Sequence, residues 1–144
     1  MSSVFVPALH FSIVQLSDIM NTCFQQYVVQ LSVTPDYFAT RFGAEGLNFQ
    51  HSGVWMQGET PVAIVLIATR GREARIAAFA LNPDFRGQGR AKPMMTAVLS
   101  RLAAEHIGPI WLEVIGGNTA AIALYETLGF RITQPLLGFS GPGP

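Results

Sequence analysis

The chain has 144 residues, 49% of them hydrophobic and 12% charged, with nine basic residues balancing nine acidic ones. This length and apolar content predict one folded domain with a single core and exclude a disordered chain. The neutral balance argues against a nucleic-acid partner, which needs clustered Lys and Arg, and against electrostatic docking on a membrane.

A few residues indicate the cellular compartment of the protein and whether a metal site is expected. Cys23 is the one cysteine, so an intrachain disulfide is impossible, as expected for a cytoplasmic protein. No Lys or Arg precedes Arg41, so a secretory signal is not expected, and the longest apolar run, Val62 to Ala68, is too short to span a bilayer. The histidines are isolated from one another in sequence, and we expect no metal site: His10, His51 and His106.

The first third of the chain predicts one strand and two helices. Phe11 to Leu16 alternates loosely between apolar and polar residues, which indicates a strand. Ser17-Asp18 then offers an N-cap for a helix whose apolar positions run from Ile19 to Val28. Thr34-Pro35-Asp36 is a second helix start, and that helix should end near Gly43 or Gly46.

The middle of the chain predicts an antiparallel meander. Three strands joined by tight turns are expected at Gly53 to Gln57, Pro61 to Thr69 and Arg72 to Leu81. The centre of the second strand is apolar at every position, which predicts a strand that is covered on both faces.

After Leu81 helices and strands alternate. Asn82-Pro83-Asp84 breaks the strand, and a glycine-containing loop leads into a helix with one apolar face: Met94, Met95, Val98, Leu99 and Leu102. Ile110 to Ile115 is the next expected strand and Asn118 to Leu128 the next helix. The two strands joined through the first of these helices should be parallel.

Only Arg131 to Pro144 remain for the C-terminal part of the fold. One strand fits there, and the Gly/Pro-rich stretch 138–144 is expected to be a flexible tail, so that a single domain covers residues 1–137. The sheet then ends early with an exposed edge, or the chain is truncated, or a partner chain completes the sheet. We favour a homodimer.

The loop from Leu81 to Lys92 suits an anion. The first N–H groups of a helix lack partners and carry the positive end of its dipole, and Gly87 and Gly89 let a phosphate approach the backbone. Three basic side chains add charge: Arg86, Arg90 and Lys92. Glycine is equally explained by the dihedral angles of such a turn. The loop is not a P-loop, because no Gly-Lys-Ser/Thr follows, and Lys92 stands where a Rossmann GxGxxG needs its third glycine.

This loop resembles the signature of a known family. Arg86-Gly87-Gln88-Gly89-Arg90-Ala91 is similar to the Q/R-x-x-G-x-G/A motif of the GNAT acetyltransferases. A second block, from Leu112 to Phe130, is similar to that of the ribosomal-protein N-terminal alanine acetyltransferases, so the resemblance covers Phe79 to Phe130. It implies a mixed α/β (α+β) fold: a mostly antiparallel central sheet with helices on both faces and a splayed parallel strand pair. It also implies an acetyl-CoA-dependent N-acetyltransferase that acts on a primary amine, of a small molecule or a peptide N-terminus, by direct transfer in a ternary complex and without a metal.

The resemblance implies which residues hold acetyl-CoA. The pantetheine arm would pair with the backbone of Phe79, Ala80 and Leu81. The pyrophosphate would lie on the amides of the signature, with these residues around it: Arg86, Gly87, Gln88, Gly89, Arg90, Ala91 and Lys92. Asn118 would contact the cofactor arm or, alternatively, cap the last helix. Pro93 departs from the family pattern but falls in the first helical turn, where proline is tolerated.

The catalytic residues also follow from the resemblance. Tyr125 matches the family's general acid, which protonates the departing CoA thiolate, although a core role on its apolar helix is the alternative. Glu113 resembles the base that takes the amine proton in the ribosomal-protein subgroup; an orienting role, or a water chain in place of a base, is the alternative. Glu73 is a weaker candidate for the base. Cys23 is expected to be a core residue and not an acyl carrier.

The acceptor and two rival functions remain open at this point. The family grips its acceptor with the first two helices and their loop, here about Cys23 to Leu47, and the few charges there favour an apolar or peptide-like amine. A non-catalytic acetyl-CoA-binding regulatory domain would keep the signature loop and tolerate loss of Glu113 and Tyr125. A dinucleotide-binding oxidoreductase would need the third glycine and an acid at the end of the next strand.

Overall fold

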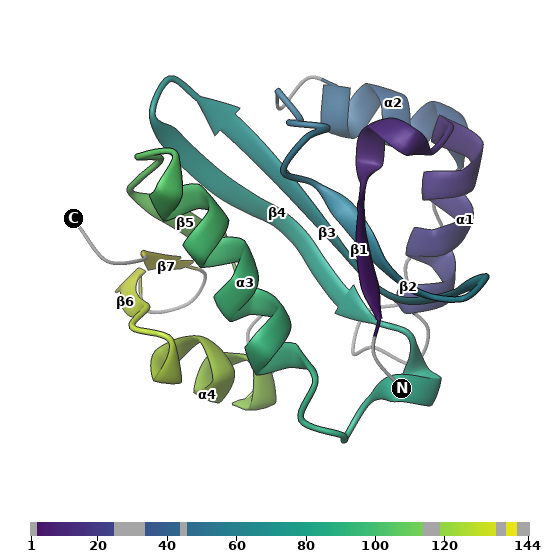
Figure 1. Ribbon diagram of the computed structural model, residues 1–144. Helices are drawn as coiled ribbons and strands as arrows, with labels where there is room; N and C mark the ends of the chain where they lie inside the picture. The colour runs from purple at the N-terminus through teal and green to yellow at the C-terminus, as the bar shows by residue number, and fades with distance from the viewer. Residues whose placement is uncertain (1–2, 25–33, 44–45, 114–118, 135–137, 141–144) are drawn as a thin grey trace.

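The structure of the protein is a computed structural model, and it describes residues 3–24, 34–43, 46–113, 119–134 and 138–140 (Figure 1). The strands are β1 (Val4–Pro7), β2 (Gly53–Gln57), β3 (Thr60–Arg70), β4 (Glu73–Leu81), β5 (Ile110–Glu113), β6 (Arg131–Gln134) and β7 (Gly138–Ser140). The helices are α1 (Ile13–Cys23), α2 (Pro35–Gly43), α3 (Ala91–Ala104) and α4 (Thr119–Thr127), and two 3-10 helices are η1 (Ala8–His10) and η2 (Pro83–Phe85). Among these described helices, none is long and apolar enough to cross a membrane.

One mixed sheet organises the described residues. Its strand order is β1-β2-β3-β4-β5-β7-β6, and every neighbouring pair is antiparallel except β4 and β5, which are parallel. Helices α3 and α4 lie on one face and α1 and α2 on the other (Figure 1). The expected mixed α/β fold, with its mostly antiparallel sheet, is therefore confirmed.

The central strand β3 separates two apolar cores. Ala63, Val65 and Ile67 pack into the core that also holds residues of α3 and α4, whereas Ile64 and Leu66 pack into the core of α1 and α2. Successive side chains of a strand point to opposite faces, so a strand that is apolar at every position fits only where both faces are covered. The burial predicted for this strand is confirmed.

The prediction for the start of the chain is wrong. The segment from Phe11 to Leu16 is not a strand: α1 begins at Ile13, and the edge strand β1 lies earlier, at Val4–Pro7. Ser12 caps the helix, because its hydroxyl accepts the Gln15 N–H at 3.0 Å while the Gln15 side chain accepts the Ser12 N–H at 2.8 Å. Leu16 belongs to the buried helix face with two later residues at helical spacing: Met20 and Cys23.

The start of α2 agrees with its prediction. Pro35 is its first residue, and the Thr34 hydroxyl accepts the Tyr37 N–H at 3.1 Å. The helix ends at Gly43, one of the two predicted positions.

The C-terminal part holds two strands, so the prediction of a single strand followed by a tail from Gly138 is wrong over Gly138–Ser140. β7 pairs with both β6 and β5 and thereby inserts between them, with Phe139 opposite Ile132 and Leu112. A short hairpin is enough to continue the sheet. The argument for a partner chain that supplies a missing strand is thereby removed.

Candidate active site

Strands β4 and β5 form the parallel pair of the sheet. The two strands are paired at Ala74, Arg75 and Ile76 of β4, and no later residue of β4 pairs with the described part of β5. From Phe79 to Leu81, β4 pairs with β3 on its other side, and the described residues provide no partner on the edge towards β5. The three residues predicted to pair with the pantetheine arm, Phe79, Ala80 and Leu81, therefore follow the part of β4 that pairs with the described residues of β5. The parallel pairing of β4 and β5 is confirmed, and the splaying of the pair stays a prediction.

Strand β4 also contains a β-bulge. Leu66 of β3 lies opposite Ala78 and Ile67 opposite Ile76, so Ala77 is an extra residue in β4. A bulge leaves its extra residue outside the ladder and bends the strand. It falls immediately after Ile76, the last residue of β4 that pairs with the described part of β5. Sequence reasoning missed this feature, because the run Ala77-Ala78 carries no side-chain signal for a bulge.

The loop after β4 is held in place by two polar side chains. The Asn82 amide donates to the Pro61 carbonyl oxygen at 2.8 Å, and its side-chain oxygen accepts the Asp84 N–H at 3.2 Å, which starts η2. Arg86 donates from Nε to the Leu81 carbonyl oxygen at 2.9 Å and from Nη2 to the Cys23 carbonyl oxygen at 2.8 Å. Arg86 thus ties the end of α1 to the end of β4, a structural role that the sequence did not indicate.

Gly87 and Gly89 have the backbone that an anion site needs. Their φ angles are +74° and +72°, in the left-handed region that disfavours residues with a Cβ. A Cβ built at either position would meet no atom of the protein within 4 Å. Packing against the protein therefore does not explain these glycines; their backbone conformation does, and it leaves the surface above the loop open for a ligand.

Helix α3 follows this loop and presents its N-terminus there. Arg90 is its N-cap residue and makes no side-chain capping hydrogen bond, so no side chain of the cap covers the first amides of α3. Pro93 is the third residue of the helix, which confirms that it is accommodated in the first turn. The helix dipole and these amides make the junction favourable for a phosphate.

Other side chains of the loop contact one another. The Arg90 guanidinium lies 5.0 Å from the centre of the Phe85 ring, and its Nε donates to the Gln88 side-chain oxygen at 3.1 Å. Lys92 is exposed in the first turn of α3, next to Ala91. The side chains of Arg90 and Lys92 thus place two positive charges beside Gly87 and Gly89.

Tyr125 lies in α4 within the core on the α3 side of the sheet. Its side chain is 6% exposed, and its ring packs edge-on against Phe130 with 5.7 Å between the ring centres. The same core includes residues from the start of α3, Met94 and Met95. The geometry is compatible with both predicted roles of Tyr125, the general acid and the core residue.

The other predicted site residues are described incompletely. Glu113 ends β5, the strand parallel to β4, but its side chain is not among the described parts, and Asn118 lies outside the described residues. Much of the predicted acceptor segment, residues 25–33 and 44–45, lies outside them as well. Glu73 starts β4 at the end opposite the glycine loop and accepts a hydrogen bond from Trp111.

Cys23 is buried at the end of α1. Burial raises the pKa of its thiol to about 12, although the nearby Arg86 charge and a hydrogen bond with the Asn82 backbone act in the opposite direction. A thiol that stays protonated is a poor nucleophile. Within the described part of the chain, no group of three or more His, Cys, Asp or Glu side chains is arranged to hold a metal ion.

Comparison with known proteins identifies the family. A family model described as the acetyltransferase (GNAT) family matches residues 13–130. The chain belongs to the GNAT acetyltransferase family. This GNAT chain is 35% identical over 89 residues to the ribosomal protein bS18-alanine N-acetyltransferase of Haemophilus ducreyi, a match that covers 62% of this chain and 59% of that protein. The matched segment spans only about three-fifths of the length of such relatives, 59% and 61% in the first two.

Solved structures of GNAT enzymes share the fold. The ribosomal-protein-S18-alanine N-acetyltransferase of Escherichia coli superposes with a TM-score of 0.76 at 19% identity, covering 99% of this chain and 96% of that one. A phosphinothricin acetyltransferase of Sinorhizobium meliloti, solved in complex with acetyl-CoA, superposes with a TM-score of 0.71 at 15% identity, covering 97% and 86%. At these identities the likeness establishes the fold, and the chemistry has to be argued from the residues of this chain.

Proposed function

We propose that this protein is an acetyl-CoA-dependent N-acetyltransferase that moves the acetyl group directly to a primary amine in a ternary complex. One observation carries the proposal: the bulged β4 leads straight into a glycine loop at the start of α3, so that the strand and an anion site are continuous. A long molecule with a polar arm and a pyrophosphate fits that combination.

The chain's own groups would hold acetyl-CoA along this path. The backbone of Phe79, Ala80 and Leu81 offers hydrogen bonds to the amide groups of the pantetheine arm. The amides from Gly87 to Ala91 would bind the pyrophosphate, with Gln88, Arg90 and Lys92 beside it. Arg86 would support the loop indirectly, because its guanidinium donates hydrogen bonds to the carbonyl oxygens of Leu81 and Cys23. Asn118 stays a proposed contact of the arm.

The reaction would take place where β4 and β5 part. The free amine forms a C–N bond with the acetyl carbon while the C–S bond to coenzyme A breaks. The backbone N–H groups at the Ala77 bulge, outside the regular ladder, are suited to stabilise negative charge that develops on the carbonyl oxygen. Tyr125 would donate its proton to the thiolate, and Glu113, or water in its place, would take the amine proton.

The acceptor is proposed to be the N-terminus of a peptide. Support comes from relatives at 34–35% identity, which are named ribosomal protein bS18-alanine N-acetyltransferases. The proposed place of action is accordingly the cytoplasm, without a nucleic-acid, membrane or metal requirement. A homodimer is not part of the proposal, because β6 and β7 remove the reason to expect one.

Calorimetric titration with acetyl-CoA tests the cofactor, with NAD as the control ligand. We expect saturable binding of acetyl-CoA alone. Absence of acetyl-CoA binding would refute the proposal. A thiol-release assay with peptides that begin with alanine then separates the enzyme from the second candidate, a regulatory acetyl-CoA-binding domain. That candidate predicts binding without turnover and indifference to Tyr125→Phe.

A further inference from the structure

Arg86 joins elements that lie on opposite faces of the sheet. Its Nη2 donates to the carbonyl oxygen of Cys23, the last residue of α1, at 2.8 Å, and its Nε donates to the Leu81 carbonyl oxygen at 2.9 Å. Helix α1 lies on one face of the sheet, whereas the chain after Arg86 leads through the glycine loop into α3 on the other face (Figure 1). The side chain of Arg86 therefore connects the two helical layers at the end of β4.

The end of α1 contacts the same region a second time. Cys23 is buried, and its thiol forms a hydrogen bond with the backbone of Asn82, the residue that precedes η2. Met20 and Ala80 belong to the same buried core as Cys23. The last turn of α1 thus packs on the end of β4 and on the start of η2.

The last turn of α1 is the part of the helix that Arg86 stabilises. The final carbonyl groups of a helix have no partner within the helix and carry the negative end of its dipole, so a guanidinium group is favourable there. The turn is closed by the Phe24 N–H, which donates to the Met20 carbonyl oxygen at 2.9 Å. Helix ends open locally at a lower free energy than the whole protein unfolds. A donor at the Cys23 carbonyl group therefore shifts the balance towards the closed turn.

The glycine loop begins directly after Arg86. Gly87 and Gly89 have φ angles of +74° and +72°, and glycine has the widest choice of backbone conformations. Within the described part of the chain, the N–H groups of Gly87, Gln88 and Gly89 donate to no protein atom. A phosphate bound by these amides would restrict the backbone next to Arg86 and thereby hold its side chain in place.

We propose that Arg86 couples occupancy of the glycine loop to closure of the last turn of α1, so that a phosphate ligand on the α3 side of the sheet stabilises the helix on the opposite side. This inference rests on the proposed function, which supplies acetyl-CoA or CoA as the ligand. The coupling is reciprocal, because a closed turn raises the affinity of the loop by the same factor. If Arg86 served only the stability of the fold, a ligand on the loop would not change the end of α1 in particular.

Hydrogen-exchange mass spectrometry with and without CoA tests the coupling, since CoA binds without a transfer step. We expect the amides of the last turn of α1, up to Phe24, to exchange about 5-fold more slowly or less rapidly still when CoA is bound. The Leu16 N–H, which donates to the Ser12 carbonyl oxygen at 2.9 Å in the first turn, should change by less than about 2-fold.

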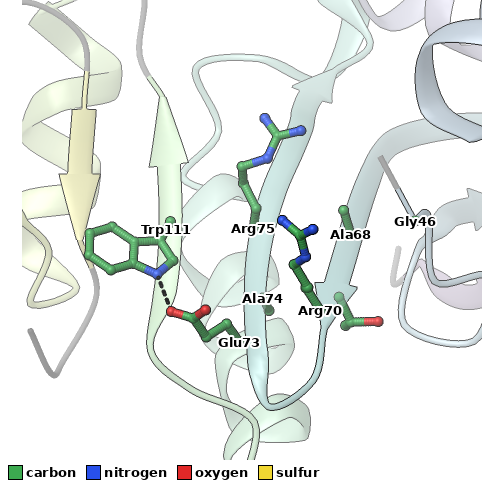
Figure 2. Close-up of a pocket in the computed structure, with 8 residues that line it drawn as sticks. Gly46, Ala68, Arg70, Glu73, Ala74, Arg75 and Trp111 are labelled. Atoms are coloured by element: carbon green, nitrogen blue, oxygen red, sulfur yellow. Dashed lines mark hydrogen bonds between the residues drawn. The ribbon is translucent and has the colours of Figure 1, made fainter. Parts of the chain in front are cut away.

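The opposite end of β4 provides a second internal reference. A pocket of about 500 Å³ lies there, and Figure 2 shows its Trp111 indole N–H donating to Glu73, at 3.3 Å. The Ala74 N–H beside this pair donates to the Pro109 carbonyl oxygen at 3.1 Å. Its exchange should also change by less than about 2-fold. Equal slowing at all three places would be general stabilisation by the ligand and would overturn the coupling.

Variants assign the effect to Arg86. Arg86→Met should abolish the additional slowing at the end of α1, and Arg86→Lys, which keeps the charge but not the two-armed donor, should leave about 2-fold or less. Arg101→Met is the matched control, because Arg101 also donates from Nη2 to a backbone carbonyl oxygen, that of His51 at 3.1 Å, but lies in the last turns of α3. It should keep the full effect at saturating CoA.

Calorimetry on the same samples separates this inference from the proposed function. Binding of CoA without additional protection at the end of α1 overturns the coupling and leaves the proposed function intact. If CoA does not bind, the proposed function fails, and inorganic pyrophosphate becomes the probe of the loop. Slower exchange at the end of α1 with pyrophosphate, lost in Arg86→Lys, then supports the coupling, whereas unchanged exchange overturns it.

Discussion

Replacement of Gly89 by glutamate tests the proposed pyrophosphate site most directly. The variant has two separable effects. Gly89 has a φ of +72°, so any side chain strains the backbone, and a glutamate also places a carboxylate above amides that are proposed to bind phosphate. A Cβ at this position meets no protein atom within 4 Å, so steric clash within the protein is not a third effect.

The size of each effect follows from these numbers. A side chain in the left-handed region costs about 1–2 kcal/mol of folding free energy, which for a chain of 144 residues lowers the melting temperature by about 3–6 °C. A carboxylate about 5 Å from one phosphate charge is repelled by about 1–3 kcal/mol at the dielectric constants of a protein surface. The affinity for acetyl-CoA should therefore fall about 5- to 150-fold.

Gly71→Glu is the matched control. Gly71 has a φ of +61° and equally open space, but it lies in the β3–β4 hairpin, at the far end of a strand of nine residues. Both variants should lose similar melting temperature, and only Gly89→Glu should lose acetyl-CoA affinity in calorimetry. Unchanged affinity in Gly89→Glu, or an equal loss in both variants, would refute the assignment of the pyrophosphate to this loop.

Three further predictions concern residues around the loop. Tyr125→Phe keeps the ring that packs on Phe130 and should lower kcat about 100-fold or more with unchanged acetyl-CoA affinity, whereas an unchanged kcat in steady-state assays would leave Tyr125 a core residue. Arg86→Met removes the donors to two carbonyl groups, so urea denaturation should show a loss of about 2–4 kcal/mol, and wild-type stability would contradict the clamp. Burial raises the pKa of Cys23 from 9.0 to about 12, so the stability that the protonated thiol contributes is complete below pH 9 and is lost as the pH rises towards 12. Denaturation of Cys23→Ala should show a shallower decline over that range, and an equal decline in both proteins would mean that the thiol is not responsible.

The glycine loop was predictable because its signal is local. Gly87 and Gly89 are required by the positive φ angles of a short strand-to-helix turn, and the helix that follows supplies the anion site by its position alone. Strand β3 was predictable for a similar reason. An uninterrupted apolar strand buries all of its side chains only when helices cover both faces of the sheet. In these places local sequence and tertiary packing point to the same structure.

The start of α1 was mispredicted where two local signals compete. Phe11 and Ile13 stand at alternate positions, which suggests a strand, but the capping box of Ser12 and Gln15 satisfies two backbone amides and fixes the helix start. The apolar face then continues through Met20 and Cys23. Counting helical spacing forward from Leu16, with the cap three residues before Gln15, would have found the helix. The C-terminal hairpin offers no such signal, because β7 depends on its pairing with β5 and β6.

The residues around Trp111 show which features could not be predicted from the sequence. Arg75 and Trp111 are 36 residues apart in sequence and become neighbours only through the parallel register of β4 and β5. Arg70 and Glu73 flank a hairpin turn, and the sequence alone would suggest a solvated pair. The hydrogen bond from Trp111 to Glu73 becomes apparent only in the folded sheet. A shift of one residue in the pairing of β4 and β5 would turn the indole to the other face of the sheet and remove it from Glu73. The glycine loop depends on local backbone conformation, whereas the contact between Trp111 and Glu73 depends on strand register, so only the first could be predicted from the sequence.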